Sequence, residues 1–69
     1  MKNQMNNKFI HVNVMEGSFN VVDKVLNVDH VIQFEPNQAR AGTCHIYLSD
    51  GKVICVTCSF EQLIEKFKN

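Results

Sequence analysis

The sequence has no excess of charge of either sign. Seven Lys and Arg residues balance seven Asp and Glu residues, so the formal net charge is zero, and Arg40 is the single arginine. Proteins bind nucleic acids largely by neutralising phosphates with Lys and Arg. No nucleic-acid partner is therefore expected, and the same scarcity of basic residues argues against a basic helix lying on a membrane surface.

Long apolar segments are also missing. No apolar run approaches the roughly 18 residues of a membrane-spanning helix, so no membrane partner is expected. Residues 1–7 are polar and lack the apolar core of a signal peptide. The three cysteines are an odd number, which does not suit a secreted disulfide framework. Together these absences predict a cytoplasmic protein with reduced thiols.

The chain is short, since 69 residues make one domain at most. A domain of this size buries only about 60% of the surface of its unfolded chain, so its hydrophobic core is thin. We expect a disordered polar tail over residues 1–7 and a single domain over residues 8–69. Small domains often gain stability by association with another subunit.

Alternating apolar residues predict most of the strands. Between Lys8 and Val14, the residues Ile10, Val12 and Val14 fall on one face, which is typical of a strand with one buried side. Further strands are predicted over residues 24–28, 31–34, 44–49 and 53–57. Pro36 ends the strand over residues 31–34, because it has no N–H to donate to a ladder. The path of residues 15–23 stays open.

The last third of the chain predicts a hairpin followed by a helix. Asp50 and Gly51 suit a two-residue turn, because Gly accepts the positive φ that such turns need. Ser59 and Gln62 have the spacing of a capping box at a helix start. One helical face is apolar and carries Phe60, Leu63, Ile64 and Phe67. The predicted fold is α+β: a small twisted antiparallel sheet of about five strands with one short C-terminal helix.

The two-residue turn fixes a register for the hairpin. It places Tyr47 opposite Ile54 and His45 opposite Val56, so that both faces of the hairpin carry apolar side chains. Because one short helix covers only one face, the other needs a sheet curled into a half-barrel or a second subunit. The predicted interaction surface is this second face, together with the strand from Phe9 to Val14 as an edge. The residues of the face are His45, Tyr47, Ile54 and Val56.

The cysteines allow a zinc site or a redox pair as alternatives. Cys55 and Cys58 form a CxxC motif, and Cys44 and His45 lie on the partner strand. In a continuous strand, however, residues three apart point to opposite faces. We therefore expect packed, reduced cysteines without a metal or another cofactor, and keep Cys44, His45, Cys55 and Cys58 as candidate zinc ligands.

No arrangement of residues predicts catalysis. His11, His30 and His45 are scattered, and the carboxylates show no paired spacing that suggests acid–base chemistry. The glycines are isolated and do not form a phosphate-binding loop. The expectation is that the protein is not an enzyme.

From about Leu26 onward the chain has an apolar strand with Asn, an acidic-Pro pair, a hairpin closed by Gly-Lys and a Ser-capped acidic helix. These pieces are residues 26–29, Glu35-Pro36, residues 46–52 and residues 59–66. In this pattern the chain resembles the FlbD family of small bacterial flagellar-operon proteins. The resemblance implies a small cytoplasmic bacterial protein with an accessory, non-enzymatic role, and it transfers no catalytic residue.

The leading functional hypothesis is a non-enzymatic accessory module that self-associates or binds a protein partner. One alternative is a nucleic-acid-binding accessory domain of the LytTR type. The other is a small zinc-binding protein that uses the cysteines.

Overall fold

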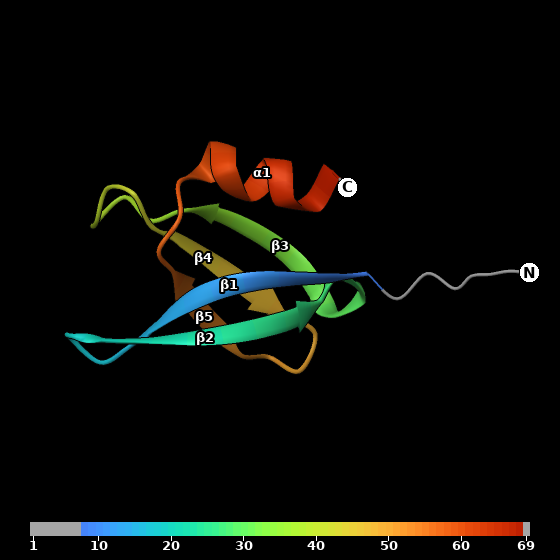
Figure 1. Cartoon of the computed structure of the whole chain (residues 1–69), viewed down its shortest axis with the longest axis horizontal. Helices are drawn as coiled ribbons and strands as arrows, with labels where there is room; N and C mark the ends of the chain where they lie inside the picture. The colour runs from blue at the N-terminus through green and yellow to red at the C-terminus, as the bar shows by residue number, and fades with distance from the viewer. Residues whose placement is uncertain (1–7, 69) are drawn as a thin grey trace, which may run out of the picture.

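The computed structural model describes residues 8–68, and the tail predicted over residues 1–7 lies outside them. The elements are β1 (Phe9–Glu16), β2 (Asn20–Asn27), the 3-10 turn η1 (Val28–His30), β3 (Val31–Pro36), β4 (Cys44–Leu48), β5 (Val53–Val56) and α1 (Phe60–Lys68). The strands form one open antiparallel sheet in the order β2-β1-β5-β4-β3. Figure 1 shows α1 on the side of the molecule near β3, with the β1–β2 hairpin on the opposite side. The predicted α+β architecture is confirmed.

Strand β1 follows the predicted alternation, with Ile10, Val12 and Val14 buried. Strand β2 is longer than expected and begins at Asn20. Residues 15–23, whose path the sequence left open, therefore form the end of β1, a turn and the start of β2. Gly17 in this turn has a φ of 82°, a conformation that costs glycine little. The two strands pair without a register shift from Phe9–Asn27 to Glu16–Asn20. Strand β1 is therefore an inner strand, and β2 is the edge, contrary to the prediction.

The two edge strands of the curled sheet, β2 and β3, are consecutive in the chain. Strand β1 meets β5 only near Val14 and Val56, where the Thr57 amide donates to the Asn13 carbonyl over 2.9 Å. At the other end, η1 alone separates β2 from β3. The Asn27 side chain caps η1 by accepting from the Asp29 amide over 2.9 Å. Strand β2 consequently ends at the corner where β3 begins, but the two edge strands do not pair, which leaves the curled sheet open.

The predicted register of the β4–β5 hairpin is wrong by one residue. The structure pairs Tyr47 with Val53 and His45 with Cys55. The loop has three residues rather than two, because the Leu48 amide donates to the Lys52 carbonyl over 2.9 Å. Gly51 takes the positive φ, 90°, at the last loop position, as three-residue hairpins require.

The shift of one residue exchanges the faces of β5, since neighbouring side chains on a strand point to opposite sides. Val56 becomes fully buried, and Ile54 packs against the core. Val53 and Cys55 move to the outer side, and Val53 is 51% exposed.

The core lies between the inner faces of β1, β4 and β5 and the helix. Leu63 is fully buried in it. The capping box is confirmed: the Ser59 amide donates to the Gln62 side chain over 3.0 Å, and the Gln62 amide donates to the Ser59 hydroxyl over 3.2 Å. Phe34 on β3 stacks on Phe67, with ring centroids 4.8 Å apart. These contacts fix α1 to the β3 side of the core.

Candidate functional site

The predicted interaction surface does not exist as one face. His45 and Tyr47 share the outer side of β4 as predicted, but Val56 is buried in the core and Ile54 faces it. The Tyr47 hydroxyl donates to the Glu35 carboxylate over 2.9 Å. This hydrogen bond raises the pKa of Tyr47, because the carboxylate holds the phenolic proton. The polar pair makes the outer side of β3 and β4 less apolar than the sequence suggested.

The four candidate zinc ligands are not brought together. Cys44 is buried on the core side, where its thiol donates to the Cys58 carbonyl over 3.3 Å, whereas Cys55 faces outward opposite His45. Burial raises the pKa of Cys44 and of Cys58, which keeps both thiols protonated. Within residues 8–68, no three His, Cys, Asp or Glu side chains gather in a metal-binding arrangement.

Exposed apolar side chains concentrate on the β1–β2 hairpin. Among residues 8–68, seven large hydrophobic residues are exposed, and five of them belong to this hairpin. These are Phe9, Phe19, Val21, Val22 and Val25. Three of them lie on one side of the hairpin. Phe9 is on the face of β1 opposite to its buried residues, and Val21 and Val25 are on the same side of β2 according to the register. We call this side, formed by Phe9, His11, Val21, Asp23 and Val25, the outer hairpin face.

Asp23 stands at the centre of the outer hairpin face. Its carboxylate accepts a hydrogen bond from the Asn13 amide group, and the His11 imidazole Nε2 lies 3.5 Å from it. Its neighbour Lys24 points to the other side of β2 and pairs with Glu16 over 3.1 Å. The outer hairpin face therefore combines two exposed valines with one carboxylate held between them.

The outer edge of β2 presents free backbone groups. Because the Asn13 carbonyl accepts from the Thr57 amide directly after β5, the backbone groups of the odd-numbered residues of β1 point to the β5 side and those of the even-numbered residues to β2. Their partners on β2 are even-numbered too. The N–H and C=O groups of Val21, Asp23 and Val25 consequently point away from the sheet. Within residues 8–68, no strand pairs with this edge.

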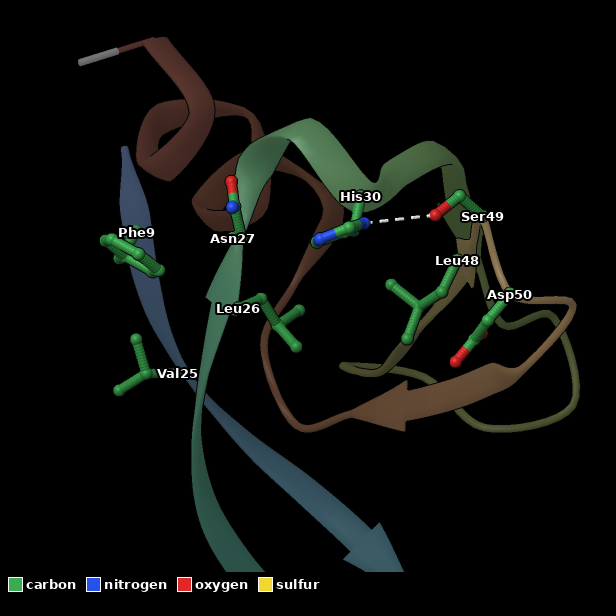
Figure 2. Close-up of a pocket in the computed structure, with 8 residues that line it drawn as sticks. All are labelled: Phe9, Val25, Leu26, Asn27, His30, Leu48, Ser49 and Asp50. Atoms are coloured by element: carbon green, nitrogen blue, oxygen red, sulfur yellow. Dashed lines mark hydrogen bonds between the residues drawn. The ribbon is translucent and has the colours of Figure 1, made fainter. Parts of the chain in front are cut away.

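A pocket of about 610 Å³ adjoins the same edge. It lies where the curled sheet stays open, between the end of β2 and the β4–β5 turn (Figure 2). Its apolar lining comes from Phe9, Val25, Leu26 and Leu48, and Figure 2 shows Leu26 and Leu48 pointing toward each other across the gap. Phe9 and Val25 belong both to the pocket and to the outer hairpin face, so the two features are continuous.

The polar rim of the pocket comes from η1 and the turn. The His30 ring nitrogen Nδ1 lies 3.2 Å from the Ser49 hydroxyl, and the Ser49 amide donates to the His30 carbonyl over 2.8 Å. Asp50 also lines the pocket, but its carboxylate accepts from the Lys52 amide over 2.9 Å. The carboxylate thus stabilises the turn instead of orienting the imidazole, so the three groups do not have the hydrogen-bond arrangement of a catalytic triad.

Sequence reasoning missed both the edge and the pocket. The segment Val21–Leu26 shows no simple alternation, because an edge strand exposes both of its faces here. The one available signal was the density of β-branched valines at positions 21, 22 and 25, which favours a strand. The pocket joins residues far apart in the sequence, and no local pattern encodes it.

No helix within the described part of the chain has the length and apolar character needed to cross a membrane. The chain matches no protein-family model, and comparisons with curated proteins and with solved structures find no significant similarity. The resemblance to the FlbD family stays a prediction.

Proposed function

We propose that the protein is a cytoplasmic, non-enzymatic interaction module that binds a protein through the edge strand β2. The single observation that carries this proposal is the concentration of exposed apolar residues on the hairpin. A concentration of exposed apolar side chains on one element of a small protein is a feature of interaction sites. The adjoining pocket adds a concave apolar site beside the edge.

The contrast between the two sheet edges supports the same function. Natural proteins protect edges with bulges, prolines and short strands, because an open edge recruits other strands. Strand β3 has such protection, since its register shifts between Val31 and Gln33 and it ends at Pro36. Strand β2 is longer, pairs regularly with β1 and contains no proline. An exposed edge that has charges at Asp23 and Lys24 but no bulge and no proline supports a role in selective binding.

A library of random peptides displayed on phage tests this function against the folded protein. The substitution Val25→Lys places a charge at the edge and at the pocket wall. Ile32→Lys is the matched control, because Ile32 is 67% exposed on the opposite edge and Val25 is 63% exposed. We expect enriched peptides that bind the wild type and Ile32→Lys but not Val25→Lys.

Native mass spectrometry over a range of concentrations covers association between copies of the chain. A dimer that Val25→Lys disrupts also supports the proposed function. A protein that stays monomeric and enriches no peptide dependent on Val25 contradicts it.

A further inference from the structure

We infer that the edge of β2 accepts an antiparallel strand from a different protein, in which a basic residue stands between two apolar residues at alternate positions. This inference rests on the proposed function and adds the chemistry of the partner.

The backbone of β2 supplies the hydrogen bonds for such a strand. Val21, Asp23 and Val25 each direct one N–H and one C=O toward the free edge, as the bonding of Asn13 to β5 implies. In an antiparallel pair, a residue opposite each of them exchanges both hydrogen bonds with it. Addition of a strand in this way is a recurrent mode of peptide recognition, in which the backbone gives affinity and the side chains give specificity.

The side chains of the outer hairpin face set the preferred sequence of the partner. Directly opposed residues of an antiparallel pair lie on the same side of the sheet, where opposite charges attract and like charges repel. Val21 and Val25 therefore favour apolar neighbours, and Asp23 favours Lys or Arg. The bond from Asn13 and the nearby His11 hold the Asp23 carboxylate on this side. Lys24 does not compete, because it pairs with Glu16 on the other side of β2.

The pocket offers a place for an apolar anchor. A residue opposite Val25 lies beside the pocket wall, and the lining residues Leu26 and Leu48 give it an apolar surface to contact (Figure 2). Asp50 adds a second carboxylate near this end of the edge. Both carboxylates favour a partner with positive charge.

A second copy of the chain is a poorer occupant of the edge. A symmetric pair of antiparallel strands has its two-fold axis perpendicular to the sheet, so residues of the same face oppose each other. If the two-fold axis passes through the middle of β2, Asp23 of one copy opposes Asp23 of the other, or Lys24 opposes Lys24. Like charges in direct opposition destabilise a strand pair. Asp23 thus disfavours the self-pairing register centred on it, whereas a basic residue of a partner strand meets it with opposite charge.

Synthetic fluorescein-labelled peptides test the inference by fluorescence anisotropy. One peptide has a central lysine with valines two positions away on each side and threonines between them, and a second has glutamate in place of lysine. The wild type is expected to bind the lysine peptide about fivefold more tightly than the glutamate peptide. Asp23→Lys is expected to reverse this preference. Glu65→Lys is the matched control, because the two carboxyl side chains are 74% and 70% exposed.

N-methylated peptides test the backbone geometry. Methylation of the lysine and valine amides removes the donors that face β2 and is expected to abolish binding, whereas methylation of the threonine amides leaves it unchanged. Equal effects of the two methylation patterns, or equal affinity for lysine and glutamate peptides, overturn the inference. If enriched library peptides depend on Val25 while the lysine peptide fails to bind, or if a dimer forms through β2, the inference fails and the proposed function stands.

Discussion

The substitution Val56→Ala is expected to destabilise the protein strongly, whereas Val53→Ala on the same strand is not. Val56 is fully buried and Val53 is 51% exposed, which follows from the three-residue loop. Removing two buried carbon groups costs about 0.8 kcal/mol each, or about 1.6 kcal/mol. The cavity that remains raises the loss to about 2–3 kcal/mol. An exposed substitution such as Val53→Ala costs about 0.5 kcal/mol or less.

Urea unfolding followed by circular dichroism measures both changes. The free energy of unfolding of a 69-residue domain is about 3–10 kcal/mol at about 0.05–0.15 kcal/mol per residue. With a slope of about 1 kcal/mol per M, Val56→Ala lowers the midpoint by about 2–3 M urea. Equal losses for the two variants, or a greater loss for Val53→Ala, refute the register and with it the assignment of the two faces.

Three further predictions concern local features. Ser59→Ala removes a capping hydrogen bond and is expected to lower the free energy of unfolding by about 1 kcal/mol in the same urea experiment, and an unchanged midpoint contradicts the capping box. The raised pKa of Tyr47 stabilises the folded protein below the ordinary tyrosine pKa, and this contribution is lost as the pH rises through the folded pKa. An ultraviolet titration should therefore show the phenol losing its proton at lower pH in Glu35→Gln, and an identical curve refutes the hydrogen bond. Cys44 is buried and has a raised pKa, so a thiol reagent followed by mass spectrometry should modify the partly exposed Cys55 first, and prior modification of Cys44 contradicts its placement.

Local sequence signals predicted the elements that depend on neighbours in the chain. The alternation of Ile10, Val12 and Val14 encodes one buried face, and Ser59 with Gln62 encodes the helix start. These features need no information from distant residues, so the sequence was sufficient for them.

Tertiary features escaped the same reasoning for identifiable physical reasons. The hairpin register depends on whether Ser49 belongs to the strand or to the loop, and a difference of one residue moves Val56 from the surface to the core. The edge position of β2 depends on β1 joining β5 instead, which only the packing of the whole sheet determines. The pocket arises because η1 brings His30 within 3.2 Å of Ser49.

The most direct test of binding at the edge of β2 is a titration of the ¹⁵N-labelled protein with the lysine peptide, followed by nuclear magnetic resonance. The account predicts that the amide signals of Val21, Asp23 and Val25 shift most, together with that of Ser49 at the pocket. The signals of His45 and Tyr47 on the outer side of β4 should stay in place. Binding that shifts His45 and Tyr47 while the β2 amides remain unchanged contradicts the account.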